Sequence, residues 1–402
     1  MKILAIESSC DEFAAAVVED GRQVLAEVIH SQIDIHQAFG GVVPEVAARS
    51  HVEVALPVVD ECLRQFAENA NVAGDVWNQI DAIAVTANPG LIGSLMIGTL
   101  TARTLALLKN KPLYAVNHIL GHVYANWLSD ENGSNGETAG VLLDSLLNAR
   151  TANGTDQVTG PPLQLGMSRG SGRLDGADES RSTPAGSINF PALALVVSGG
   201  HTQIMLFRDY GDYETVGQTV DDAVGEAFDK VAKIIGLSYP GGPSIAAAAA
   251  KGDMDKYHLP KPRLDNPLNF SFSGLKTAVL RAVQAAVGVD HTFPSHLLAE
   301  KLTDEQRRDF AASFQKTAVE VLVEKMVAAA ERYQPKSVCL AGGVAANKSL
   351  REKLAETMPV EVFCPSPQHC TDNAAMIGAA AYFLRQKVPP INPKELEIFP
   401  TK

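Results

Sequence analysis

The chain is poor in cysteine, and its cysteines lack the spacing of a metal-binding or redox pair. Its 402 residues include five cysteines, at positions Cys10, Cys62, Cys339, Cys364 and Cys370. An odd number without a Cys-x-x-Cys pair argues against a disulfide framework and against a structural zinc ribbon. This composition favours a reducing compartment, and we expect a cytoplasmic protein.

Long hydrophobic runs are also missing. Apolar stretches such as residues 245–250 are short and consist mostly of alanine, and Met1-Lys2 lead directly into a predicted strand. A membrane-spanning helix needs about 20 apolar residues, and a signal peptide needs an apolar core behind a basic start. We therefore expect neither a membrane span nor a signal peptide.

Positive charge is in deficit, with 34 lysines and arginines against 46 aspartates and glutamates and a net charge of −12. This balance argues against indiscriminate binding of polyanions, because such binding depends on many lysines and arginines. Two interpretations of the local basic residues stay open, a nucleic-acid-binding surface or scattered solvated charges. The residues concerned are Lys251, Lys256, Lys261, Arg263, Lys276, Arg281, Lys301, Arg307 and Arg308.

What the chain does contain is a repeated order of strands. A strand, a tight turn and two more strands are predicted at the N-terminus, the order returns after residue 190, and helices alternate with strands after each triplet. The fold class is therefore α/β, with two duplicated lobes that face each other. The predicted strands are 3–6, 14–18, 24–30, 81–86, 113–116, 193–197, 201–207, 213–219, 337–340 and 360–363.

Residues 129–189 separate the two halves. This segment is rich in Gly, Ser, Thr, Asn and Asp and has one short apolar patch at 141–147. Such a composition cannot bury a core of its own. We interpret it as a mostly disordered surface insert of low complexity.

Small-residue turns follow several of the predicted strands. Glycine lets backbone amides approach an anion closely, and a helix that starts after such a turn adds partial positive charge. One turn of this kind would be weak support, but five around two matched lobes favour a nucleotide cleft. The turns are 7–12, 88–90, 198–201, 240–244 and 341–347.

Two histidines and a distant aspartate predict a metal site. His118 and His122 are four residues apart and therefore lie on one face of a helix, and Asp372 stands at the start of a late Ala/Gly-rich helix. The alternative is a polar helix face without a metal. Ile119, Leu120 and Gly121 supply no glutamate beside the first histidine, which argues against a zinc protease of the His-Glu-x-x-His type.

A further acidic stretch runs from Asp221 to Lys230. Helical spacing places Asp222, Gly225, Glu226 and Asp229 on one face. These residues either border the cleft and accept hydrogen bonds or form a solvated acidic face.

Taken together, these motifs resemble one family, the universal tRNA adenosine threonylcarbamoyltransferases. The resemblance covers nearly the whole chain except the insert. It rests on Glu7-Ser8-Ser9-Cys10-Asp11-Glu12, Gly40-Gly41-Val42-Val43-Pro44-Glu45, Pro89-Gly90-Leu91, His118 with His122, Val197-Ser198-Gly199-Gly200-His201-Thr202, Gly225-Glu226-Ala227-Phe228-Asp229-Lys230, Tyr239-Pro240-Gly241-Gly242-Pro243, Ser271-Phe272-Ser273-Gly274-Leu275-Lys276 and Cys370-Thr371-Asp372-Asn373.

The resemblance implies an activity and partners. It implies transfer of a threonylcarbamoyl group from threonylcarbamoyl-AMP to N6 of adenosine 37, in tRNAs that read codons beginning with A, with release of AMP. It further implies two actin-like (RNase H-like) lobes with a nucleotide cleft between them. One divalent metal ion is expected, Fe2+ or alternatively Zn2+. Expected partners are tRNA, an inactive paralogue subunit and a P-loop ATPase subunit.

The resemblance also assigns residues and boundaries. Metal ligands fall on His118, His122 and Asp372, and an acidic pair near the reacting centre falls on Asp11 and Glu12. Residues 1–117 would form the first lobe and 118–371 the second, with a metal-site helix at 118–128 and a C-terminal helix at 372–400 packed back on the first lobe. Nucleotide and substrate contacts fall on Val196, Val197, Ser198, Gly199, Gly200, Asp229, Gly242 and Asn347.

Three departures from the family pattern are visible. Phe13 stands where threonine is usual, Leu120 replaces a common glutamate, and the insert lengthens the loop after the metal helix. None of them removes a proposed ligand. The alternative functions are a phosphotransferase of the sugar-kinase type, a metalloprotease, and a non-catalytic scaffold.

Overall fold

The first half of the chain forms a five-stranded mixed sheet with the order β3-β2-β1-β4-β5 in a computed structural model that describes residues 1–129 and 188–398. Strands β1, β2 and β3 are antiparallel neighbours, whereas β4 and β5 run parallel to β1. Strands β1, β2 and β4 are almost wholly buried, as expected for strands covered on both faces. The bounds are β1 Lys2–Glu7, β2 Glu12–Glu19, β3 Gln23–Ser31, β4 Ala82–Asn88 and β5 Leu113–Asn117.

The second half repeats this topology in the order β10-β9-β6-β7-β8. Strand β6 is antiparallel to β7 and parallel to β9, so β6 corresponds to β1 of the first sheet. The predicted α/β fold with two duplicated lobes is therefore confirmed. The bounds are β6 Ala192–Val197, β7 Thr202–Asp209, β8 Asp212–Gln218, β9 Ser337–Ala341 and β10 Val362–Phe363.

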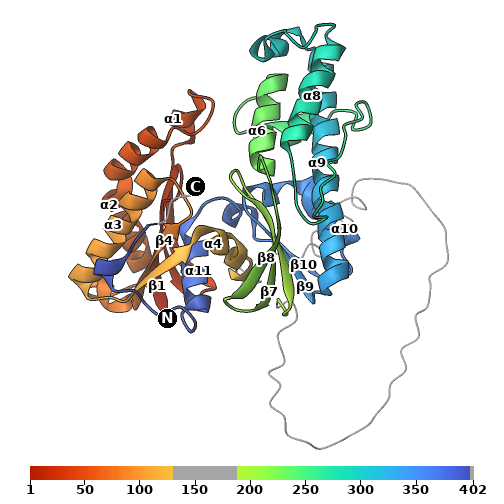
Figure 1. The fold of residues 1–402 in the computed structure, drawn as a ribbon. Helices are drawn as coiled ribbons and strands as arrows, with labels where there is room; N and C mark the ends of the chain where they lie inside the picture. The colour runs from red at the N-terminus through yellow and green to blue at the C-terminus, as the bar shows by residue number, and fades with distance from the viewer. Residues whose placement is uncertain (130–187, 399–402) are drawn as a thin grey trace, which may run out of the picture.

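Helices cover both sheets (Figure 1). In the first half, α2 and α3 pack together over one face of the sheet, while α11 contacts β1 and β2. In the second half, the long α9 contacts α7, α10, β6 and β7. The bounds are α1 Ile33–Gln37, α2 Pro44–Asn69, α3 Ile92–Lys109, α4 His118–Tyr124, α6 Val224–Ile235, α7 Gly241–Ala249, α8 Ser273–Ala286, α9 Asp304–Tyr333, α10 Lys348–Thr357 and α11 Ala374–Leu384.

Local sequence signals explain where several helices begin. Thr303 and Gln306 form a reciprocal capping box at the start of α9, because each side chain bonds the other residue's backbone N–H. Short 3-10 turns connect the remaining segments, namely η1 Val76–Gln79, η2 Ala125–Trp127, η3 Ser295–Lys301, η4 Gly343–Ala346, η5 Pro367–His369 and η6 Pro393–Glu395.

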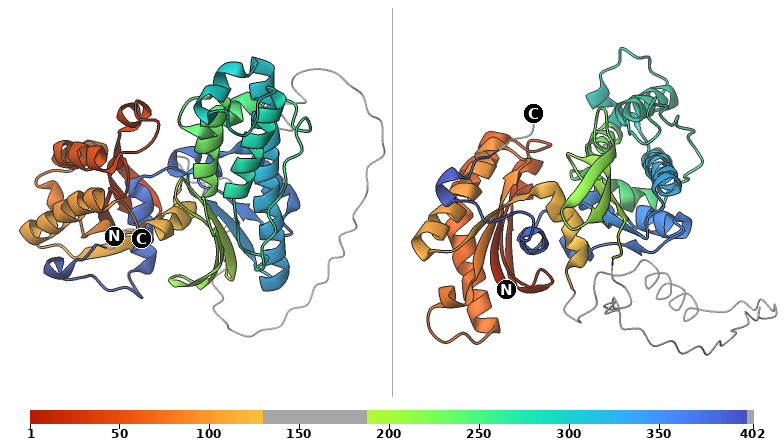
Figure 2. Two further views of the ribbon diagram at one scale, coloured as in Figure 1. Left: turned by 45° about the horizontal axis from the view of Figure 1, so that its top comes forward. Right: turned by 60° about the horizontal axis from the view of Figure 1, so that its bottom comes forward.

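The two halves meet along α4 and α11. One buried apolar cluster contains residues of both sheets together with these two helices, among them Ile3, Leu120, Val196 and Ile377. Figures 1 and 2 show α11, the last helix of the chain, lying inside the first half next to α4. A residue at the start of either helix therefore lies close to the junction of the lobes.

Two predicted helix extents were wrong. The C-terminal helix was expected at 372–400, but α11 ends at Leu384, and Pro389, Pro390 and Pro393 follow where a helix would need backbone donors. Ile391 instead pairs with Leu113 on the edge of the first sheet. The metal-site helix was expected at 118–128, but α4 ends at Tyr124 and continues only as the short turn η2.

The insert expected at 129–189 lies outside the described residues, apart from its ends at Ser129, Ile188 and Asn189. Within 1–129 and 188–398, every helix is too short or too polar to cross a bilayer.

Candidate metal centre and nucleotide turns

The end of β5 places the histidine pair. Asn117 is the last residue of this strand, and its side-chain oxygen accepts hydrogen bonds from the backbone N–H groups of Ile119 (2.9 Å) and Leu120 (3.1 Å). This N-cap starts α4 at His118, and His122 follows one turn later. The two imidazole rings are 4.6 Å apart between centroids.

Asp372 reaches the same point from the far end of the chain. Asn373 caps α11 by accepting a hydrogen bond from Met376 N at 2.8 Å, so Asp372 stands just before the helix. Helices α4 and α11 pack closely because Gly121 has no side chain. A Cβ at Gly121 would lie 2.8 Å from Ile377 Cδ1.

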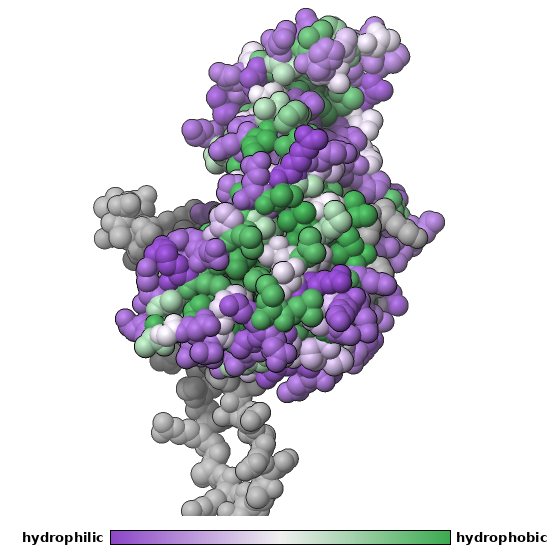
Figure 3. Space-filling view, turned by 90° about the vertical axis from the view of Figure 1, so that its left-hand side faces the viewer, coloured by the Kyte–Doolittle hydropathy of each residue, from purple (hydrophilic) through white to green (hydrophobic). Residues whose placement is uncertain are grey.

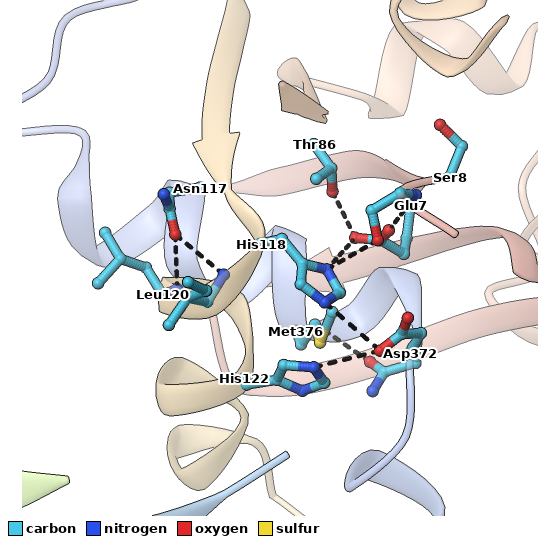
Figure 4. A network of polar contacts seen from close by, with 12 residues as sticks. Glu7, Ser8, Thr86, Asn117, His118, Leu120, His122, Asp372 and Met376 are labelled. Atoms are coloured by element: carbon cyan, nitrogen blue, oxygen red, sulfur yellow. Dashed lines mark hydrogen bonds and ion pairs between the residues drawn. The ribbon is translucent and has the colours of Figure 1, made fainter. Parts of the chain in front are cut away.

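The three side chains converge as the sequence predicts. Their ligand atoms all lie within 4.8 Å of one another. His122 Nε2 lies 3.1 Å and His118 Nε2 lies 3.6 Å from Asp372 Oδ1 (Figure 4). Both histidines are buried, and Asp372 is partly buried.

The donor set fits a divalent metal ion. Two imidazole nitrogens and one carboxylate oxygen suit iron or zinc. Both ring nitrogens of His122 are buried without a hydrogen-bond partner among the described residues, because the approach of Nε2 to Asp372 lacks hydrogen-bond geometry. A buried imidazole in this state is unfavourable, and a cation at Nε2 would remove part of the penalty.

Charge accumulates at this centre. Burial alone would lower the pKa of His118, but the negative charges of Asp372 and Glu7 outweigh it and raise that pKa to about 9. Burial alone would raise the pKa of Asp372, but His118 and His122 hold it well below its usual value. The pocket therefore favours a positive charge beside Asp372.

Glu7 supports His118 from behind, a contact that the sequence analysis missed. Its Oε2 lies 3.3 Å from His118 Nδ1, and Ser9 Oγ lies 3.1 Å from the same nitrogen. Thr86 donates a hydrogen bond to the Glu7 carboxylate. With Nδ1 occupied on this side, Nε2 is left to face Asp372. The available signal was an acidic residue, Glu7, directly after the apolar strand predicted at 3–6.

The acidic pair lies next to the metal centre. Glu12 begins β2 and accepts a hydrogen bond from Ser31 Oγ at 3.2 Å. Burial, followed by the charges of Asp372 and Asp11, raises the pKa of Glu12 to about 9. Asp11 is nearly buried in the turn between β1 and β2.

Val196 and Val197 end β6, and residues 198–201 form the turn that follows it. Ser198 Oγ accepts a hydrogen bond from His201 N at 3.1 Å, and Gly225 N donates to Ser198 O at 3.2 Å. A Cβ at Gly342 would lie 2.5 Å from Val197 O, so only glycine fits there. Burial and the charges of His118 and His122 lower the pKa of His201 to about 4.

The remaining predicted contacts lie on or beside three helices. Asp229, on α6, accepts a hydrogen bond from Gly241 N at 2.6 Å, which joins α6 to the first turn of α7, where Gly242 lies. Asn347 caps α10 by accepting from Leu350 N at 3.1 Å, and its amide nitrogen donates to Gln315 at 2.8 Å. Both side chains therefore hold local structure, and their substrate role stays a prediction.

The predicted placement of Asp222 on a helical face was wrong. Helix α6 begins at Val224, so Asp222 lies in the preceding turn. Its carboxylate forms ion pairs with Lys230 (3.0 Å) and Lys276 (3.1 Å). These contacts give Asp222 a structural role and lower its pKa despite partial burial.

Comparisons with known proteins agree with this site. The family model described as "TsaD: tRNA N6-adenosine threonylcarbamoyltransferase" matches residues 23–144 and 176–379. A relative of that name from Thermomicrobium roseum is 45% identical over 96% of this chain and 93% of its own length. One from Symbiobacterium thermophilum is 43% identical over 95% and 91%.

One solved structure shares the fold. Full-length HypF in its phosphate- and nucleotide-bound form aligns with a TM-score of 0.51 and 12% identity. The alignment covers 97% of this chain and 47% of HypF. At this level of identity the likeness concerns the two-lobed architecture alone.

Proposed function

We propose a role in the reaction for each group of site residues. The premise is that this chain belongs to the tRNA N6-adenosine threonylcarbamoyltransferase family and thus serves the synthesis of threonylcarbamoyladenosine in tRNA. The donor is threonylcarbamoyl-AMP, the acceptor is N6 of adenosine 37, and AMP is the leaving group. The single observation that carries the assignment is the convergence of His118, His122 and Asp372 within 4.8 Å.

His118, His122 and Asp372 hold one divalent ion, Fe2+ in preference to Zn2+. When bound, such an ion supplies a Lewis acid that polarises a carbonyl oxygen. Glu7 keeps the His118 ring oriented through Nδ1. Ile119 follows His118 in the sequence, where a metalloprotease of the His-Glu-x-x-His type has its general-base glutamate, which disfavours that alternative.

The glycine turns bind the AMP portion. Gly199 and Gly200 are exposed at the end of β6, and a Cβ on either would meet nothing within 4 Å, so the backbone is open to a ligand there. Helix α10 starts directly after the turn at 342–347 and directs its N-terminal amides toward the same edge of the sheet. An adenylate is already activated, so positioning does much of the work.

Asp11 and Glu12 act on the incoming amine. Glu12 orients the amine, and Asp11 accepts the proton that N6 loses on attack. The support for this assignment is the position of both carboxyl groups in the segment that follows Glu7, the residue in contact with His118. An unpaired loop base enters such a site without the full cost of opening a duplex.

The partner subunits remain proposals as well. An inactive paralogue would bind the exposed apolar face of α2 and α3, and a P-loop ATPase would join that complex in the cytoplasm. We call this surface the α2/α3 face. It consists of Val52, Leu56, Ile92, Met96 and Leu100 and is seen as a hydrophobic area in Figure 3. Apolar patches of this size on a folded chain commonly mark protein interfaces.

The test is nucleoside mass spectrometry of unmodified tRNA incubated with the protein, its partners, the adenylate-forming synthase, threonine, bicarbonate and ATP. We expect threonylcarbamoyladenosine with the wild-type chain and at least a hundredfold less with Asp372→Asn, because one ligand is lost. Asp209→Asn, which changes an exposed acid, should modify tRNA normally. Modified adenosine at the wild-type rate with Asp372→Asn would remove the proposed role of the cluster.

A further inference from the structure

Phe39 projects from the segment between α1 and α2, and its side chain is 60% exposed. Ile35, on α1 itself, is also exposed. An aromatic ring left in solvent is uncommon for this chain, because Phe13, Phe66, Phe228 and most other phenylalanines are fully buried. We therefore expect a binding partner to cover the exposed ring.

A series of buried hydrogen bonds holds this segment against the acidic turn. His36 is fully buried, with Nε2 lying 3.3 Å from Gln32 Oε1 and Nδ1 accepting from Val43 N at 3.3 Å. Gln32 N donates to Asp11 O at 3.2 Å, and Phe39 N donates to His36 O at 3.0 Å. The backbone of Phe39 is thus tied through His36 and Gln32 to the turn that carries the acidic pair.

The same segment touches the second lobe on both sides of Phe39. Gln37 Nε2 donates to Tyr239 O at 3.4 Å, and a Cβ at Gly40 would lie 4.0 Å from Lys233 Nζ. Figure 1 shows α1 and α6 on the facing sides of the two lobes. Burial, followed by the charges of Asp11 and Asp229, raises the pKa of Tyr239.

Lys233 provides a charge next to Gly40, the residue that follows Phe39. It is exposed on α6, and within the part of the chain that the structure describes it forms no ion pair. Its neighbour Lys230, by contrast, is held by Asp222 and Glu226. An exposed ring and a lysine without an ion pair on adjoining segments offer the two contacts that single-stranded nucleic acid uses, since a ring stacks on a base and an ammonium contacts a phosphate.

We propose that Phe39 and Lys233 form a contact site for the anticodon loop of the tRNA substrate. The Phe39 ring stacks on an unpaired base beside the adenosine that is modified, and Lys233 binds the adjoining phosphate. The inference rests on the proposed function, because it takes tRNA as the substrate. It gives the acidic chain a local means of holding RNA next to its acidic turn, despite a net charge of −12.

The experiment measures the KM for tRNA and the kcat of the complete system, with the full-length chain and its partners, for Phe39→Tyr, Phe39→Leu and Phe39→Ala. Stacking requires a π face, so we expect Phe39→Tyr to keep the KM within about twofold, while Leu and Ala raise it about tenfold. The kcat should stay nearly constant. Ile35→Ala is the matched control for an exposed apolar side chain on the same segment and should change neither value.

Lys233→Gln should raise the KM several-fold and lower the slope of log KM against log salt by about one. Lys336→Gln, at an exposed lysine directly before β9, is the control and should leave the slope unchanged. An unchanged KM with Phe39→Ala, or equal values for Phe39→Leu and Phe39→Tyr, would overturn the stacking contact while leaving the proposed function intact. A wild-type chain that forms no modified adenosine would instead remove the proposed function.

Discussion

At the scale of single residues, Glu27 places a carboxylate against the first turn of α11. Its Oε1 accepts a hydrogen bond from Ala375 N at 2.9 Å, three residues after Asp372. Burial raises the pKa of Glu27 to about 7, although the hydrogen bonds from Ala375 and Ala374 oppose that rise. The folded chain therefore binds a proton more tightly at Glu27 than the unfolded chain does.

This shift predicts a pH dependence of stability. Between the ordinary value of 4.5 and about 7 the folded state binds more protons, so the contribution of Glu27 to the free energy of unfolding falls as pH rises. Glu27→Gln keeps the hydrogen-bond acceptor and removes the charge. We expect it to gain on the order of 2 kcal/mol over the wild type between pH 5 and pH 8.

Urea unfolding at a series of pH values measures this difference. Glu53→Gln, an exposed substitution on α2, should run parallel to the wild type. A Glu27→Gln curve that also stays parallel to the wild type across the window would show that Glu27 is not the titrating group.

Spacing predicted part of the metal site. His118 and His122 had to share a helix face because they are four residues apart, and the structure places both rings within reach of one carboxylate. That this carboxylate is Asp372 depends on how two helices far apart in sequence pack, which local pattern does not encode. Glu7 was missed for the same reason, since its contact with His118 joins the end of β1 to the start of α4, far along the chain.

At the scale of elements, Arg351 on α10 links two turns of the site. Its guanidinium is buried, and it donates to Ala345 O in the turn at 342–347. It also donates to Pro365 O at 2.8 Å and to Cys370 Sγ at 2.9 Å, two residues before Asp372. One side chain thus holds the glycine turn and the metal-ligand loop together.

Arg351→Met should lower both the stability of the fold and the affinity for the metal. The substitution leaves buried carbonyl oxygens without a donor, so we expect a loss of about 2–4 kcal/mol in the free energy of unfolding. Metal affinity should also fall, because the loop before Asp372 loses its anchor. Denaturant unfolding and metal titration measure the two effects.

Lys353→Met is the control on the same helix, since Lys353 is exposed and makes only a 3.7 Å ion pair with Glu356. Wild-type stability and metal affinity in Arg351→Met would refute the linking role.

The strands could be predicted well, and helix ends could not. A short continuous apolar run such as Leu193 to Val197 is typical of a strand that is buried on both faces. Helix ends depend on caps and contacts, so α11 stopped well short of the expected range and α6 began after Asp222. The need for glycine at position 121 likewise could not be predicted, because it depends on the packing of Ile377 against this position.

At the scale of the whole molecule, the two lobes are joined through a shared core rather than by a simple hinge. Helix α4 contacts β5 of the first sheet and β6 and β9 of the second, and α11 returns to the first sheet. The boundary predicted at residues 117 and 118 therefore falls where the chain enters this shared core, and the division into domains stays a prediction. The duplication itself was visible in the sequence because both halves begin with the same three strands.

The α2/α3 face predicts a partner interface. Met96→Asp should abolish or weaken at least tenfold the binding of the proposed paralogue, because it places a charge in an apolar contact. Met254→Asp is the matched control, since Met254 is 55% exposed against 53% for Met96 but lies in the second half. Analytical ultracentrifugation of the mixed subunits measures the complex. Equal weakening of the complex by both substitutions, or no weakening by either, would show that the paralogue binds elsewhere.

The claim on which the whole account depends is that His118, His122 and Asp372 hold one metal ion. The most direct measurement is anaerobic titration of the chelator-treated protein with Fe2+ and, separately, Zn2+, followed by X-ray absorption of the loaded sample. We predict one equivalent bound, with imidazole nitrogen and carboxylate oxygen at about 2.0–2.2 Å, and at least a hundredfold weaker binding in folded His122→Ala and Asp372→Asn. Tight binding that survives both substitutions, or an active protein that binds no metal, would contradict it.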